Sequence, residues 1–142
     1  MADKLCVVVD LSVVLDVIQQ RAAHYTDSAR ILDAVVREEI KGVLAAHSIT
    51  TLFYVITRWQ NRKVAVTALT GLLDVFTIAA VDNQVIRKAL SWGWKDLEDA
   101  VQMAAALAAG VDYIITRNKK DFQAQPVPVL APVGLLALLA QK

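Results

Sequence analysis

Acidic residues stand in this sequence where apolar segments begin or end. The run Leu5–Val9 contains only apolar residues and is followed directly by Asp10. A second acidic group, Asp96, Glu98 and Asp99, opens a long alanine-rich stretch. Carboxylates that converge in a fold repel one another, and a divalent cation relieves that repulsion. Mg²⁺ takes oxygen ligands and can activate water for attack on a phosphodiester. The pattern therefore predicts metal-assisted phosphodiester hydrolysis.

The segments that would position these acids alternate between strands and helices. Short β-branched apolar runs predict strands at Leu5–Val9, Val43–His47, Val75–Val81, Asp112–Thr116 and Val127–Leu130. Helical spacing and capping residues predict helices over Leu11–Ala23, Asp27–Lys41, Ser48–Trp59, residues after Asn61, Asp82–Ser91, Asp96–Gly110 and Pro132–Gln141. Such alternation is typical of an α/β domain with a mainly parallel, five-stranded sheet.

The acids and their polar neighbours should meet at one edge of this sheet. Ligands of open α/β sheets bind beyond the carboxyl ends of the strands. Asp10 follows the first strand, and Thr116 ends the fourth, followed by Asn118 and Asp121. The helix that begins at Asp96 runs into the fourth strand, so its first turn should lie at the same edge.

A purely structural interpretation of these residues stays open. Asp96 and Asp99 fit an acidic capping motif, since carboxylates are favoured at helix N-termini. Asp16 is expected to be an ordinary surface or cap residue. Asp10 is harder to explain in this way, because a carboxylate directly after a fully apolar strand is poorly solvated unless a site opens there.

Composition limits the remaining possibilities. The chain has 142 residues, 56% of them hydrophobic, and a net charge of +1. We expect one domain over residues 1–142, and local basic clusters rather than a global positive field for any contact with nucleic acid. The single cysteine, Cys6, favours a reducing compartment, and we see neither a secretory signal nor a membrane helix. A cytoplasmic protein is expected.

Several other chemistries lack their motifs. His24 and His47 are far apart in sequence and have no cysteine partner nearby, which disfavours a zinc site. No phosphate-binding glycine loop and no G-x-S-x-G turn is present. Ser12, two residues after Asp10, stands where a haloacid-dehalogenase-like phosphatase would need a second acid.

The order of the motifs resembles that of the PIN-domain family. The stretches that carry the resemblance are "VVVDLSVVLDVI" and "DLEDAVQMAAALAAGVDYIITRNKKDF". Many PIN-domain proteins are ribonucleases that depend on Mg²⁺ or Mn²⁺, including VapC-type toxins of toxin–antitoxin pairs. The resemblance implies a three-layer α/β/α sandwich and an endoribonuclease of this type.

The resemblance also implies roles for particular residues. Asp10, Asp99 and Asp121 would be catalytic, and Asp10, Asp99 and Asp96 would hold the metal. The supporting polar residues would be Ser12, Thr51, Thr116 and Asn118. In the family an acid stands early in the helix after the second strand, whereas this chain has Thr50 and Thr51 there. Asn118 replaces a frequent Asp. A catalytically weakened module that binds RNA or protein is therefore the alternative function.

The expected partners are RNA, a cognate antitoxin and a second copy of the chain. Arg117 and Lys119, beside the predicted site, would bind RNA phosphates. The apolar residues of segment 51–59 and the C-terminal "GLLALLA" could form a dimer surface. Trp59, Trp92 and Trp94 are expected to pack in the core or at an interface.

Overall fold

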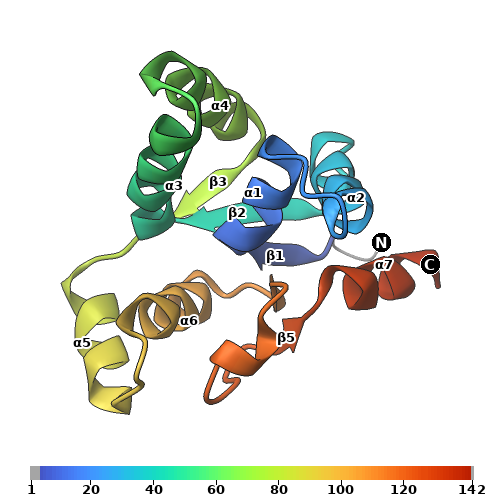
Figure 1. Cartoon of the computed structure of the whole chain (residues 1–142). Helices are drawn as coiled ribbons and strands as arrows, with labels where there is room; N and C mark the ends of the chain where they lie inside the picture. Colours follow the sequence, from blue (N-terminus) through green and yellow to red (C-terminus); the bar gives the residue numbers. More distant parts are fainter. Residues whose placement is uncertain (1–3, 142) are drawn as a thin grey trace.

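A parallel sheet of five strands forms the centre of the structure, a computed structural model that describes residues 4–141. The strands are β1 (Cys6–Val9), β2 (Lys41–Ala45), β3 (Thr77–Ala79), β4 (Tyr113–Ile115) and β5 (Val129–Leu130). Their order across the sheet is β3-β2-β1-β4-β5, and every neighbouring pair is parallel. The first strand is therefore central, as its uninterrupted apolar sequence predicts (Figure 1).

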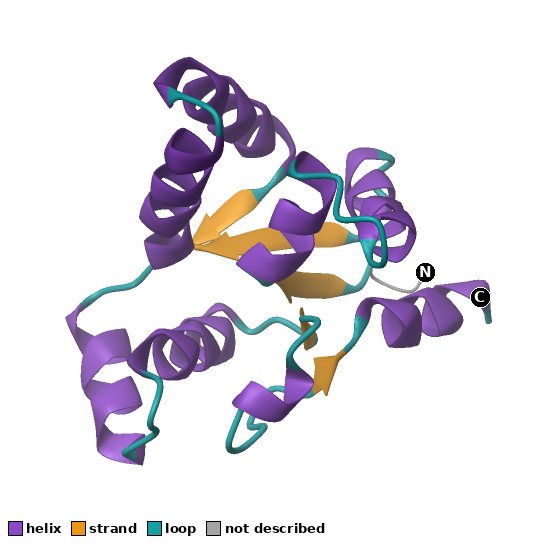
Figure 2. Ribbon diagram, in the orientation of Figure 1, coloured by secondary structure: helices purple, strands orange, loops and turns teal. Residues whose placement is uncertain are grey.

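Helices cover both faces of the sheet (Figure 2). They are α1 (Leu11–Ile18), α2 (Tyr25–Val36), α3 (Ala46–Trp59), α4 (Arg62–Val75), α5 (Asn83–Trp92), α6 (Leu97–Ala109) and α7 (Pro132–Ala140). Helices α1, α2, α3, α4 and α7 pack on one face, and α5 and α6 pack on the other. The predicted α/β/α sandwich with its five-stranded sheet is confirmed.

The central strand divides the core into two parts because its side chains alternate between the faces. Val7 and Val9 pack among α1, α2 and α3, whereas Val8 packs among α5 and α6. All three valines are 0% exposed. This burial on both faces holds the end of β1, and with it Asp10, at a fixed place in the sheet.

Two predicted boundaries around the second strand are wrong. Gly42 was expected just after a helix, but it lies inside β2, and the helix before it, α2, ends at Val36. A Cβ on Gly42 would come within 2.5 Å of Phe76 Cε1, so close packing rather than a turn requires this glycine. His47 was placed in the strand, but it lies in the first turn of α3.

The caps predicted for the later helices are confirmed. The side chains of Asn61, Asp82 and Asp96 accept hydrogen bonds from backbone N–H groups at the starts of α4, α5 and α6. Gly110 ends α6 in the left-handed region, with φ 70°. Helix α6 therefore has the bounds that its sequence predicts, which fixes the position of its acidic first turn.

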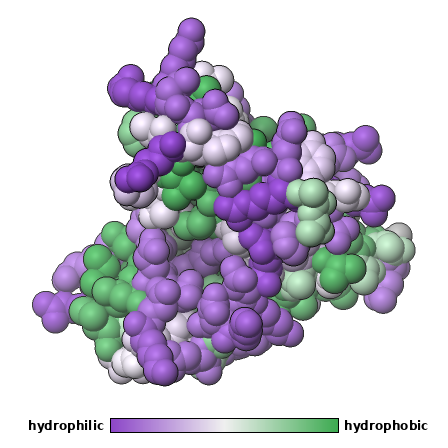
Figure 3. Space-filling model, viewed as in Figure 1, coloured by the Kyte–Doolittle hydropathy of each residue, from purple (hydrophilic) through white to green (hydrophobic). Residues whose placement is uncertain are grey.

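The surface carries apolar residues in several places. Figure 3 shows hydrophobic residues over α5 and around α7. Leu52 and Ile56 of α3 are buried in the core, so a dimer surface on this helix cannot include them. Trp92 and Trp94 stack on each other with ring centroids 5.5 Å apart. Within residues 4–141, no helix combines the length and apolar character needed to cross a membrane.

Candidate active site

The site lies where the strand order reverses, at the carboxyl ends of β1 and β4. These strands are neighbours, and their connections leave in opposite directions along the sheet, which opens a crevice at this point. The backbone N–H of Asp10 donates to the carbonyl of Ile115 with an N···O distance of 2.9 Å. Asp10 and Thr116, each directly after its strand, are thereby brought side by side.

Four hydrogen bonds orient the carboxylate of Asp10. Its Oδ2 accepts from the Ser12 backbone N–H (3.1 Å), from Ser12 Oγ (2.5 Å) and from Thr116 Oγ1 (3.1 Å). Its Oδ1 accepts from Gln102 Nε2 at 3.0 Å. Asp10 is also the N-cap of α1. Since Ser12, Gln102 and Thr116 are buried, the carboxylate is held in one orientation.

A cavity of about 170 Å³ opens beside Asp10. Carboxylates, two amide side chains and a histidine dominate its lining, which consists of Asp10, Leu11, Ser12, His47, Ser48, Asp96, Glu98, Asp99, Gln102, Asn118 and Asp121. These residues come from the end of β1 and the start of α1, from the first turn of α3, from the first turns of α6 and its cap, and from the segment after β4. Figure 3 shows hydrophilic residues gathered around a recess on this side of the molecule. All the acids predicted for the site meet in one cavity.

The environment of this cavity changes the titration of Asp99. The pKa of Asp99 is raised from 3.8 to about 7, mainly by burial and then by the negative charges of Asp96, Asp10, Asp121 and Glu98, in that order. Burial and the neighbouring negative charges both make the ionised form of Asp99 unfavourable. A cation would remove this penalty.

Asp96 combines the structural and the chemical interpretation. Its Oδ1 accepts a hydrogen bond from the Asp99 backbone N–H at 3.1 Å, as a helix cap does. Its side chain also lines the acidic cavity and a second, adjoining cavity of about 470 Å³, which Lys95 and Lys120 line as well. Capping therefore places Asp96 at the site rather than excluding it.

Gln102, Glu98 and His47 line the cavity but were not assigned to the site from the sequence. Gln102 lies one turn after Asp99, and this spacing of three on an amphipathic helix could have identified it. Glu98 accepts a hydrogen bond from Thr51 Oγ1 at 3.0 Å. His47 lines the cavity and lies with Nε2 3.0 Å from the Glu98 carbonyl oxygen. These contacts join α3 to α6, and no local pattern in the sequence predicts them.

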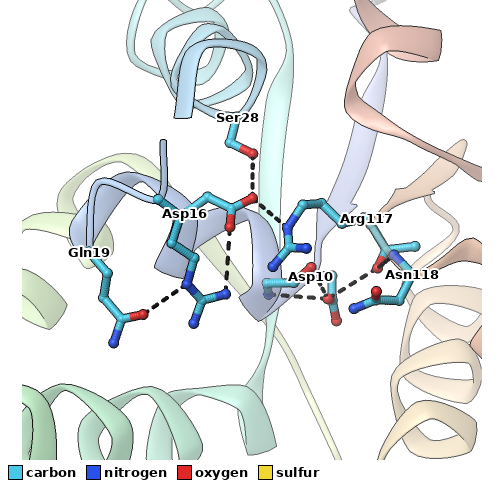
Figure 4. Close-up of polar contacts among 9 residues, drawn as sticks. Asp10, Asp16, Gln19, Ser28, Arg117 and Asn118 are labelled. Carbon is cyan, nitrogen blue, oxygen red and sulfur yellow. Dashed lines mark hydrogen bonds and ion pairs between the residues drawn. The ribbon is translucent and has the colours of Figure 1, made fainter. Parts of the chain in front are cut away.

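The basic residues predicted to bind phosphate lie apart from the acidic cavity. Arg117 Nε lies 2.6 Å from Asp16 Oδ2, and its side chain is 20% exposed (Figure 4). The distance is that of an ion pair, although the Nε–H is not aligned for a hydrogen bond. Lys119 is exposed in a short 3-10 helix, η1 (Lys119–Asp121). The next residue, Lys120, lines the adjoining cavity.

Asp16 is not the surface or cap residue that the sequence predicts. It is 0% exposed, accepts from Ser28 Oγ at 2.9 Å and lies 3.5 Å from Arg21 Nη1. Together with Arg117 it joins α1, α2 and the loop after β4 (Figure 4). This loop carries Asn118, whose backbone N–H donates to Thr116 Oγ1 at 3.1 Å. A buried ion pair therefore anchors the loop that borders the cavity.

The donor set fits a hydrated Mg²⁺ or Mn²⁺ ion. Within residues 4–141, no three His, Cys, Asp or Glu side chains lie close enough together to ligate one ion directly. Mg²⁺ keeps several of its waters and is commonly held by one or two carboxylates plus substrate phosphate. Asp10 and Asp99 line the same cavity and supply such a pair, and the lining contains no cysteine that would favour a softer metal.

Comparisons with known proteins identify relatives of this arrangement. A family model described as PIN domain matches residues 6–120. No match is found among curated proteins. A toxin–antitoxin complex from Klebsiella pneumoniae is 19% identical, with a TM-score of 0.68 over 89% of this chain and 97% of that chain. VapBC-1 from nontypeable Haemophilus influenzae is 15% identical, with a TM-score of 0.69 over 91% and 99% of the two chains.

A further similar structure is VapC20 from Mycobacterium tuberculosis, described as a toxin that cleaves the sarcin–ricin loop. It is 16% identical, with a TM-score of 0.64, over 76% of this chain and 86% of that chain. At these identities the structural matches show a shared fold.

Proposed function

The chain belongs to the PIN-domain family, and from this premise we propose that it is an endoribonuclease that depends on Mg²⁺ or Mn²⁺. One observation carries the proposal: five carboxylates from three separate chain segments line a single cavity at the carboxyl ends of β1 and β4. Burial and the repulsion among these acids raise the pKa of Asp99 to about 7, and strongly shifted pKa values of this kind are frequent at functional sites.

In this proposal each polar residue has a defined task. Asp10 and Asp99 hold the metal, and Ser12 and Thr116 keep the Asp10 carboxylate oriented through their hydrogen bonds. When bound, the metal ion would activate water and offset negative charge on the phosphodiester. The further polar residues of the lining, Asp96, Asp121 and Asn118, hold and orient water for attack, and Thr51 supports them from α3.

The RNA backbone would enter beside the acids through the adjoining cavity. Lys95 and Lys120 line this cavity together with Asp96, Asp99 and Asp121. Their ammonium groups can hold phosphates next to the reacting one. Lys119 is exposed on the same short helix and can extend this contact along the strand. Arg117 has a different task, because its pairing with Asp16 makes it an anchor for the loop.

Cleavage of short single-stranded RNA by the purified protein tests this function. With Mn²⁺ or Mg²⁺ present we expect cleavage that a chelator abolishes. The substitution Asp10→Asn should lower the rate by about 100-fold or more, since it removes a group that holds positive charge at the reacting phosphate. A matched control is Asp74→Asn, which changes an exposed carboxylate in α4 and should leave the rate unchanged. Cleavage that survives Asp10→Asn would come from a contaminant and would contradict the proposal.

The alternative is a module that binds RNA or protein without cleaving it. The absence of three direct ligands among residues 4–141, together with Thr51 and Asn118 at positions where relatives have acids, favours this alternative. Titration calorimetry with Mn²⁺ separates the two functions. Binding at submillimolar metal supports the nuclease, and no binding supports the module.

We also propose a protein partner. Several structures similar to this chain are toxin–antitoxin complexes. By analogy, this chain would be a toxin that acts on RNA in the cytoplasm, and a small antitoxin protein would bind it. Exposed apolar residues such as Tyr54 and Trp59 of α3 are suited to an interface, and we propose a homodimer. Co-purification with the product of a neighbouring gene and the mass in solution test these two partners.

A further inference from the structure

One acid of the cavity is held by a different element from the one that carries it. Glu98 lies in the first turn of α6, and two residues of α3 contact it. Thr51 Oγ1 donates to Glu98 Oε1 at 3.0 Å, and His47 Nε2 lies 3.0 Å from the Glu98 carbonyl oxygen. A carbonyl oxygen only accepts, so His47 Nε2 carries the proton and donates it. Glu98 is thus fixed from α3 at both its side chain and its backbone.

The two contacts come from the same face of α3. His47 and Thr51 are four residues apart in this helix, so their side chains lie one above the other. Helices α3 and α6 pack on opposite faces of the sheet, and these two hydrogen bonds connect them. The pair therefore joins the two helix layers at the mouth of the cavity, next to Ser48, which also lines it.

Holding Glu98 has a chemical consequence. An exposed Glu side chain normally samples many rotamers, and a hydrogen bond from a partly buried threonine reduces this freedom. Glu98 lines the same cavity as Asp10 and Asp99, and its charge adds to the repulsion on Asp99. Thr51 therefore keeps a carboxylate at the α3 side of the cavity although α3 itself has no acid in its first turn.

We propose that Glu98, held by Thr51 and His47, is an additional carboxylate of the metal site and binds the ion through its coordinated waters. The inference rests on the proposed metal-dependent function. In it, the acid on the side of the metal site that faces α3 is provided by α6. Contact through water agrees with the absence of three direct ligands within residues 4–141. Carboxylates that act on a metal from outside its direct ligands typically change its affinity by 10- to 100-fold.

Titration calorimetry of the full chain with Mn²⁺ tests this assignment without relying on catalysis. We expect Glu98→Gln to weaken binding about 10-fold, because the amide keeps the acceptor for Thr51 but loses the charge. Thr51→Val should weaken binding to a smaller extent. The double variant should bind no more weakly than Glu98→Gln alone, because Thr51 acts through Glu98.

Thr50→Val is the matched control. Thr50 Oγ1 donates to the His47 carbonyl within its own helix at 3.1 Å, so this variant should bind Mn²⁺ as the wild type does. Equal affinities for wild type and Glu98→Gln would overturn the assignment and leave the metal site intact. A wild type that does not bind Mn²⁺ would instead contradict the proposed function. If Thr51→Val fails to fold, the comparison of Glu98→Gln with wild type still decides the question.

Discussion

A carboxylate at the end of a buried strand loses contact with water, and hydrogen bonds from three side chains replace that hydration at Asp10. Ser12, Gln102 and Thr116 donate to it from α1, α6 and the end of β4. Hydrogen bonds to an ionised group are stronger than neutral ones, so these donors stabilise the carboxylate and fix its direction. Asp10 is thus fully hydrogen-bonded within the fold, and its negative charge still faces the cavity.

Asp16 forms a buried ion pair whose contribution to stability can be measured. Its side chain is 0% exposed and lies between Arg117 Nε at 2.6 Å and Arg21 Nη1 at 3.5 Å. Asp16→Asn leaves Arg117 without its counter-charge in a largely buried place. Removing one partner of a buried pair costs roughly 3–5 kcal/mol, and because Arg117 is 20% exposed we expect the lower end, about 3 kcal/mol. Urea denaturation measures this loss in the free energy of unfolding.

An exposed pair supplies the control for Asp16. Arg37 Nε lies 3.1 Å from Asp33 Oδ2, and the two side chains are 69% and 58% exposed. Such i,i+4 surface pairs contribute at most about 1 kcal/mol. Asp33→Asn should therefore change the unfolding free energy little. Equal effects of the two substitutions would show that burial of the Asp16 pair has no energetic weight.

At the scale of elements, helix α6 carries most of the site. Its N-terminal turn contains Glu98 and Asp99, Asp96 caps it, and Gln102 follows one turn later. Its apolar residues from Ala100 to Ala106 are buried against the sheet, so the helix cannot slide or rotate without opening the core. Small alanine side chains let the helix pack closely on the sheet, and Gln102 donates to Asp10 from it.

Strand β2 packs closely against its neighbours at Gly42. A Cβ at Gly42 would lie 2.5 Å and 2.7 Å from two atoms of the Phe76 ring and 2.8 Å from Val35 Cγ1. All three residues are buried, so the neighbours have little room to move. We expect Gly42→Ala to lower the unfolding free energy by about 1–3 kcal/mol, the usual cost of overpacking a core. Urea denaturation measures it.

Gly71→Ala is the matched substitution with the opposite expected sign. Gly71 lies in the exposed part of α4, and nothing is within 4 Å of the added Cβ. Alanine in a helix interior is more stable than glycine by roughly 0.5–1 kcal/mol. An increase for Gly71→Ala with no decrease for Gly42→Ala would refute the packing argument for β2.

At the scale of the whole molecule, folding brings together charges that the unfolded chain keeps apart. Asp10, Asp99 and Asp121 are separated by tens of residues in sequence but border one cavity. Burial, together with the repulsion from the neighbouring acids, raises the pKa of Asp99 from its usual 3.8 to about 7. The folded state therefore holds a proton on Asp99 at pH values where the unfolded state has released it.

This difference predicts how stability depends on pH without metal. Between pH 3.8 and about 7 the folded state binds more protons at Asp99 than the unfolded state, so its contribution to stability falls as pH rises. The contribution is full below pH 3.8 and lost above about pH 7. We expect the midpoint of urea denaturation, measured with a chelator present, to be lower at pH 8 than at pH 5 for the wild type when each value is taken relative to that of Asp99→Asn. A constant difference between the two proteins across this range would contradict the raised pKa.

The layers, the strands and the edge of the sheet at which the acids gather could all be predicted from the amino-acid sequence. Those features follow from local patterns: uninterrupted apolar runs for buried strands, capping residues and Pro132 for helix starts, and Gly110 for a helix end. The position of Asp10 could be predicted in the same way, because a residue that directly follows a central strand must lie at the carboxyl edge of the sheet. The PIN-domain motifs then supplied the expected site.

Which polar side chains pair across that edge could be seen only in the folded chain. Asp16 is buried with Arg117, although its spacing alone fits a surface residue. Glu98 is held by Thr51, and Gln102 donates to Asp10 across 92 positions of the chain. Hydrogen bonds and ion pairs depend on distances of a few tenths of an ångström between segments that folding alone brings together, and no periodicity in a sequence encodes those distances.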